Sequence, residues 1–160
     1  MISDKLQKAI NDQITAEMWS ANLYLSMSFF LQKEGYDGCA NWLKKQSQEE
    51  LAHAYDMAAY LIKRGGVAKV DKIDVVPQQW DGVLEVFENV YEHECNVSKL
   101  IESLVKVASE DKDMASQDFL WNYVREQVEE EATAQGIVEK IRKAGKSALL
   151  FIDDKLGQRA

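Results

Sequence analysis

The chain has 160 residues, of which 46% are hydrophobic and 29% are charged, and its formal net charge is −8 at pH 7. This length suits one domain with a sizeable core, and the composition excludes a disordered polymer. The negative charge argues against binding to nucleic acid, whose phosphates attract basic surfaces, and favours cations as partners.

The first residues, MISDKLQKAINDQ, lack the basic and then apolar run of a signal peptide. No stretch of the chain approaches the roughly 18 apolar residues of a membrane span. We therefore expect a cytoplasmic protein that makes no membrane contact. One proline and eight glycines provide few of the turns that a β-sandwich or barrel needs, which favours long helices.

Apolar residues recur in steps of three and four along four segments, as expected for helices that each bury one stripe. The predicted helices span residues 4–33, 38–64, 81–109 and 113–144. Ser3 is the predicted N-cap of the first helix, and glycines mark the later ends. These glycines are Gly35 and Gly38 before the second helix, Gly65 and Gly66 after it, and Gly145 after the fourth. The segment 147–156, SALLFIDDKL, predicts a short fifth helix, which we expect at a subunit contact.

Connection lengths predict how the helices are arranged. The short links at 34–37 and 110–112 can join only antiparallel neighbours. The link from Gly66 to Trp80 carries the only proline, and its β-branched residues are spaced as in an extended chain. A helix of about 27 residues is roughly 40 Å long, a distance that about 15 extended residues can cover. The sequence thus predicts an all-α, single-domain protein over 1–160, in which the four-helix bundle (4–144) has one long crossover between helices two and three.

Polar residues interrupt each apolar stripe near its midpoint. They are Glu17 in the first helix, Glu50 with the adjacent His53 in the second, Glu94 in the third, and Gln127 and Glu130 in the fourth. Because the midpoints of bundled helices share one level, these side chains should converge in the core. Clustered buried carboxylates are costly, and the stripes contain no lysine or arginine to pair with them. The acids must therefore be protonated or bound to a cation.

The residue types favour a pair of metal ions. Oxygen ligands with one imidazole suit iron or manganese better than copper(I) or a structural zinc ion. Glu50 and His53 lie on one helical face and can reach the same ion, and Glu50 is the candidate bridge to a second. Dinuclear carboxylate sites in bundles use one Glu from each of two helices and Glu-x-x-His from each of the other two. Gln127 and Glu130 replace the second such motif, which predicts an asymmetric site.

Further polar residues flank these positions. Tyr24 is predicted to be a core tyrosine with a satisfied hydroxyl, which could also donate to a ligand carboxylate or serve as an electron source. His93 falls off its stripe and is predicted to be a surface or interface residue. A third, weaker cation site is predicted beside the pair, formed by Glu49, Glu126, Glu129 and Glu130.

With these residues assembled, the sequence resembles the bacterial non-haem ferritins along nearly its full length. The matching motifs are EMWSANLYLSM, QEELAHA, YEHE, REQVEEE and AGKSALLFIDDKL. The resemblance implies a hollow homo-oligomeric shell of twenty-four subunits. Each subunit would act as a ferroxidase, using dioxygen or hydrogen peroxide to oxidise Fe(II) at a di-iron centre, and the shell would store Fe(III) as a mineral.

The resemblance also implies a role for each matching residue. The first iron would be bound by Glu17, Glu50 and His53, and the second by Glu50, Glu94 and Gln127 with Glu130 nearby. The third iron would be bound by Glu49, Glu126, Glu129 and Glu130. Catalysis would rest on Tyr24, Glu17, Glu50, Glu94 and Gln127.

Related families and one unrelated function remain as alternatives. Haem-binding bacterioferritins have a methionine after the bridging glutamate, whereas Leu51 stands here, so no haem is expected. A DNA-protecting mini-ferritin builds its site across a subunit interface and often carries a basic tail. A rubrerythrin-like peroxidase normally adds a CxxC iron module, which this sequence lacks. Another di-iron oxidase, or a helical scaffold with protonated core acids, would also produce this pattern.

Overall fold

The computed structural model describes residues 1–160, and these form four α-helices with no β-strand. The helices are α1 (Asp4–Lys33), α2 (Asp37–Lys63), α3 (Val83–Glu110) and α4 (Met114–Leu156). The hydroxyl of Ser3 accepts a hydrogen bond from the backbone N–H of Leu6, as predicted for an N-cap. None of the four helices combines the length and the hydropathy that a membrane-spanning helix requires.

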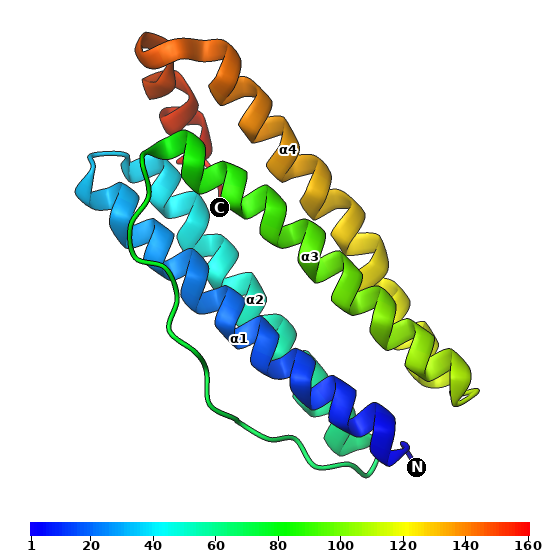
Figure 1. Ribbon diagram of the computed structural model, residues 1–160. Helices are drawn as coiled ribbons and strands as arrows, with labels where there is room; N and C mark the ends of the chain where they lie inside the picture. The colour runs from blue at the N-terminus through cyan, green and yellow to red at the C-terminus, as the bar shows by residue number, and fades with distance from the viewer.

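The four helices form a bundle in which α1 packs chiefly on α2 and α3 packs chiefly on α4. The helices α2 and α3 run in the same direction, opposite to α1 and α4 (Figure 1). Residues 64–82 form neither helix nor strand and run alongside α1 from one end of the bundle to the start of α3 (Figure 1).

Polar side chains of α1 hold this link against the bundle. The side-chain amide of Asn11 donates to the carbonyl of Val67 and accepts from the N–H of Lys69, each over 2.8 Å. Farther along α1, the hydroxyl of Ser26 donates to the carbonyl of Pro77 over 2.6 Å. These bonds satisfy backbone groups that have no partner in a helix or sheet, so the link can stay extended along α1.

The apolar core is divided into two clusters. One contains Leu31, Phe87 and Ile141 and lies toward the end where α3 begins, whereas the other contains Leu6 and Leu61 and lies toward the opposite end. The level between them is occupied by buried polar side chains. The bundle therefore interrupts its hydrophobic core at one level, where the sequence predicted converging acids.

The chain reverses direction near the end of α4. Gly145 has φ 66° and ψ 178°, a left-handed backbone conformation that glycine adopts without strain from a side chain. Beyond this kink the chain turns back toward the bundle (Figure 1). The segment 147–156, predicted as a separate fifth helix, is the part of α4 that follows the kink. It contacts α2, where the backbone N–H of Cys39 donates to the carboxylate of Asp153 over 2.8 Å.

The contact between the returning segment and α2 depends on a glycine. A Cβ atom added to Gly38 would lie 1.8 Å from the carbonyl oxygen of Asp153. We expect Gly38→Ala to lower the free energy of unfolding by about 1–3 kcal/mol, because one backbone must move away from the other. A matched control is Gly136→Ala in α4, whose added Cβ meets no atom within 4 Å and which should gain up to about 1 kcal/mol from helix propensity. Denaturant unfolding measures both variants, and equal stabilities would contradict the docking seen here.

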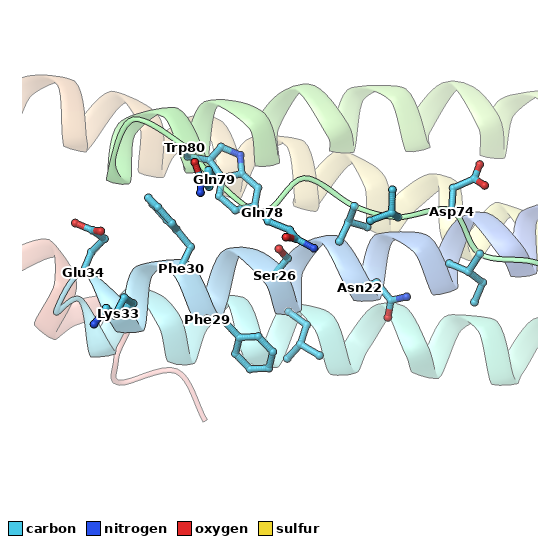
Figure 2. Close-up of a pocket in the computed structure, with 14 residues that line it drawn as sticks. Asn22, Ser26, Phe29, Phe30, Lys33, Glu34, Asp74, Gln78, Gln79 and Trp80 are labelled. Atoms are coloured by element: carbon cyan, nitrogen blue, oxygen red, sulfur yellow. The ribbon is translucent and has the colours of Figure 1, made fainter.

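A groove of about 920 Å³ lies between α1 and the link (Figure 2). The rings of Phe30 and Trp80 close one end of it, with their centroids 5.4 Å apart. The side chain of Phe29 lies at its edge and is largely exposed. None of the polar residues at the midpoints of the helices lines this groove, so it is a feature of the outer surface of α1.

Candidate metal centre

Three carboxylates lie in the polar level between the two apolar clusters. Glu17 of α1, Glu50 of α2 and Glu94 of α3 are each at most 2% exposed. The fourth helix contributes Gln127, which is also buried, and Glu130, which is partly buried. The structure thus brings the predicted midpoint residues of all four helices together.

The most compact group consists of Glu17, Glu50 and His53, whose ligand atoms all lie within 4.8 Å of one another. The Nδ1 atom of His53 is 3.3 Å from Oε2 of Glu50 and 3.7 Å from Oε2 of Glu17. That oxygen of Glu17 is buried and has no hydrogen-bond partner. A buried polar atom without a partner costs about 1–3 kcal/mol. The arrangement therefore suits a cation held between the two carboxylates and the imidazole.

The other ring nitrogen of His53 is also engaged. Its Nε2 atom lies 2.9 Å from a carboxylate oxygen of Glu126. The ring of Tyr123 packs edge-on against the imidazole at 5.3 Å between centroids. If Nε2–H donates to Glu126, Nδ1 carries the free lone pair that faces Glu17 and Glu50. Metal-binding histidines use this arrangement, in which a carboxylate fixes the tautomer and orientation of the ring.

Glu94 is positioned by donors from two other helices. The hydroxyl of Tyr24 donates to Oε1 of Glu94, and the amide nitrogen of Gln127 donates to Oε2 over 3.1 Å. Tyr24 is fully buried, and this burial, together with the nearby charge of Glu94, raises its pKa well above the ordinary value. Tyr24 is therefore a neutral donor, in agreement with its predicted role as a core tyrosine with a satisfied hydroxyl.

Two buried glutamines were not predicted as part of the site. The amide nitrogen of Gln13 donates to Oε1 of Glu17 over 2.8 Å. That of Gln46 donates to Glu130 over 2.8 Å and lies 3.4 Å from both Glu50 and Glu94. A signal for them exists in the sequence. Each glutamine precedes a midpoint glutamate by four residues, which places the amide on the same buried face one helical turn earlier.

A second acidic group lies beside the first and is more exposed. It consists of Glu49, Glu126 and Glu130, whose ligand atoms lie within 4.8 Å of one another. Glu129, which was predicted to belong to this group, is exposed and is not among the three residues that come together. Glu49 forms an ion pair with Arg159, a residue that the sequence interpretation did not include.

His93, predicted to be a surface or interface residue, is partly buried against α1. Its Nε2 atom lies 2.7 Å from the hydroxyl of Ser20, and its ring packs against those of Trp19 and Tyr24. Burial lowers its pKa to about 4, so the imidazole is neutral near pH 7. His93 therefore packs against the ring of Tyr24, and its hydrogen bond goes to Ser20 and not to a carboxylate.

The metal-free centre retains protons. Burial raises the pKa of Glu50 well above its ordinary value, and Glu17 and Glu94 add to the shift. Burial likewise raises the pKa of Glu94, and it raises that of Glu130 to about 7. Burial alone would lower the pKa of His53, but the neighbouring carboxylates of Glu126, Glu17 and Glu50 raise it. A bound cation would replace these protons with positive charge.

Comparison with known proteins places this chain in a family. The family model for the ferritin-like domain matches residues 7–144. The chain is 68% identical over 159 residues to the bacterial non-heme ferritin of Bacteroides fragilis (strain 638R), a match that covers 99% of this chain and 100% of that protein. It is 39% identical to the bacterial non-heme ferritin of Campylobacter jejuni, with 91% of this chain and 87% of that protein covered. Among solved structures, an open pore ferritin from the archaeon Archaeoglobus fulgidus superimposes with a TM-score of 0.98, 48% identity and 100% of both chains covered.

Proposed function

This chain belongs to the ferritin family of iron-storage proteins, and from that premise we propose that it oxidises Fe(II) at a di-iron centre in each subunit and stores Fe(III) inside a twenty-four-subunit shell. The main support is the buried oxygen of Glu17, which has no hydrogen-bond partner and lies beside Glu50 and His53. In such a protein iron is the substrate and the cargo.

The ligands divide between two ions. Nδ1 of His53 and the carboxylates of Glu17 and Glu50 would hold the first ion. The second would lie between Glu50 and Glu94, with Glu130 and the amide of Gln127 beside it. Glu50 would bridge the two, because one of its oxygens faces His53 and the other faces the Gln46 amide, which also lies 3.4 Å from Glu94. Tyr24 would orient Glu94 through its hydrogen bond.

This placement accounts for the chemistry. Two Fe(II) ions held side by side can give one electron each, which with two protons reduces dioxygen to hydrogen peroxide or hydrogen peroxide to water. Because both electrons leave together, no one-electron radical is released. The protein supplies the positioning and the negative charge that favours the ferric product.

The first experiment is an anaerobic titration of the metal-free protein with Fe(II) by calorimetry, followed by oxygenation. We expect two or three ions per chain, rapid growth of ferric absorbance, and an electron-dense core inside a large particle. Tight binding of two ions without mineral or shell would indicate another di-iron oxidase. Absence of stoichiometric binding would indicate a helical scaffold whose core acids are protonated.

Exposed apolar side chains support assembly into a shell. Leu150 and Phe151, in the segment of α4 after the kink, are 62% and 79% exposed, and Phe29 beside the groove of Figure 2 is 62% exposed. Apolar surface of this kind is typically covered by a neighbouring subunit. Mass measurement in solution and electron microscopy would test the shell, and would show whether its pores are open, as the name of the Archaeoglobus fulgidus relative states for that protein.

The amide at Gln127 is proposed to weaken the second iron site, so that oxidised iron can leave for the cavity. We expect Gln127→Glu to bind the second Fe(II) about tenfold more tightly in anaerobic titration, because a carboxylate adds negative charge beside the ion. Gln135→Glu is the matched control, since Gln135 is exposed on the same helix and the charge change is identical. Unchanged affinity in Gln127→Glu would contradict this role for the amide.

A further inference from the structure

Arg159 connects the segment after α4 to the second acidic group. Its guanidinium lies 2.9 Å from a carboxylate oxygen of Glu49 and donates to the side-chain oxygen of Gln46 over 3.0 Å. It also donates to the carbonyl of Trp42 and lies over the ring of that residue, 4.6 Å from the centroid. The amide of Asn41 donates to the carbonyl of Arg159 over 3.2 Å. Both the backbone carbonyl and the guanidinium of Arg159 are therefore held in place by contacts with α2.

Each carboxylate of the second acidic group already has a donor. Glu49 pairs with Arg159, Glu130 accepts from Gln46, and Glu126 lies beside Nε2 of His53. Arg159 controls two of these contacts. By donating to the oxygen of the Gln46 amide, it turns the nitrogen of that amide toward Glu130.

We propose that Arg159 is a positioning residue that lowers the cation affinity of the site formed by Glu49, Glu126 and Glu130. This inference rests on the proposed function, with the second acidic group taken as the third cation site that the sequence predicts. A cation that binds there must displace the guanidinium from Glu49 and must free Glu130 from Gln46. Arginine remains charged at every physiological pH, so the competition is set by the position of the side chain and not by a proton.

The consequence for iron is a site that fills last and empties first. An ion bound at the second acidic group lies close to the charge of Arg159, which repels it. When the ion leaves, the guanidinium can form its ion pair with Glu49 again. Arg159 would thus favour passage of iron through this site over its retention there.

The test is an anaerobic calorimetric titration of the assembled metal-free protein with Fe(II), comparing wild type with Arg159→Gln. We expect the affinity of the weakest site to rise about tenfold in the variant, because a partly exposed positive charge next to the ion is removed. The tightest site, formed by Glu17, Glu50 and His53, should change little, because Arg159 contacts none of these residues. Arg159→Lys retains the charge without the forked contacts, and its affinity should lie between those of wild type and Arg159→Gln.

The matched control is Arg142→Gln, which removes the same charge from an exposed ion pair with Glu88 on the surface of the bundle. This variant should bind Fe(II) like wild type. Detection of a third ion only in Arg159→Gln would also support the proposal. Equal or weaker binding at the third site in Arg159→Gln, or an equal gain in Arg142→Gln, would overturn it while leaving the di-iron centre intact. If the wild-type protein bound no stoichiometric Fe(II) at all, the proposed function would be overturned instead.

Discussion

Glu50→Met should reduce the rate of Fe(II) oxidation by at least about 100-fold, because changes even to groups that only support metal ligands cost about 10–100-fold. Glu50 is the proposed bridge between both ions, and a thioether of similar length cannot replace a carboxylate between two hard cations. The measurement is stopped-flow absorbance of the ferric product in the assembled protein. Asp56→Asn, at an exposed position of the same helix, should oxidise iron like wild type.

The same variant separates function from stability. Glu50 is buried, its hydrogen bonds to Gln46 and His53 are long, and burial raises its pKa well above the ordinary value. Its removal should therefore raise the melting temperature of the metal-free protein while oxidation is lost. If both stability and oxidation fell, Glu50 would be a structural residue. Replacement of Glu94 should not raise the melting temperature in the same way, because it would leave the buried hydroxyl of Tyr24 without a hydrogen-bond partner.

The metal-free protein should become less stable as the pH rises from 6.5 to 8. Glu50, Glu130 and His53 have pKa values that folding raises, to about 7 for Glu130, so the folded state binds more protons than the unfolded state in this range. Stability then falls as these protons are lost, by about 1.4 kcal/mol per pH unit for each proton. His93, whose pKa is lowered to about 4, acts in the opposite direction but only below about pH 6.5, where the unfolded imidazole becomes charged.

Thermal unfolding of the metal-free protein at several pH values tests whether stability falls as the pH rises. Saturation with a divalent cation should reverse the slope, because the cation displaces the same protons and binds more tightly as the pH rises. Glu50→Met should flatten the slope of the metal-free protein. A melting temperature of the metal-free protein that rises between pH 6.5 and 8 would contradict the protonation described here.

The helices and the polar level were predictable from local sequence patterns. Ser3 caps α1, Gly35 and Gly65 have positive φ angles where helices end, and the midpoint acids interrupt regular apolar stripes. These signals are local, since each depends on residues within a few turns of one helix. The resemblance to the bacterial non-haem ferritins is confirmed by the family match.

The unpredicted contacts depend on how distant segments pack. Arg159 reaches Glu49 only because the chain reverses at Gly145 and because Gly38 lets two backbones approach closely. No periodicity connects residues so far apart in sequence. The contacts of His93 were hidden for a similar reason, since this residue lies off its own stripe but faces the side chains of Ser20 and Trp19 on another helix. Gln13 and Gln46 had a usable signal in their spacing from Glu17 and Glu50.

The long link between α2 and α3 has a consequence for the order of folding. The short loops make α1–α2 and α3–α4 two hairpins with local contacts, and local contacts form faster than distant ones. Glu17, Glu50 and His53 belong to the first hairpin, whereas Glu94 and Gln127 belong to the second. The proposed di-iron site is therefore complete only after the hairpins dock. Iron bound there joins the two halves of the chain, so metal loading should slow their separation and thus the unfolding of the subunit.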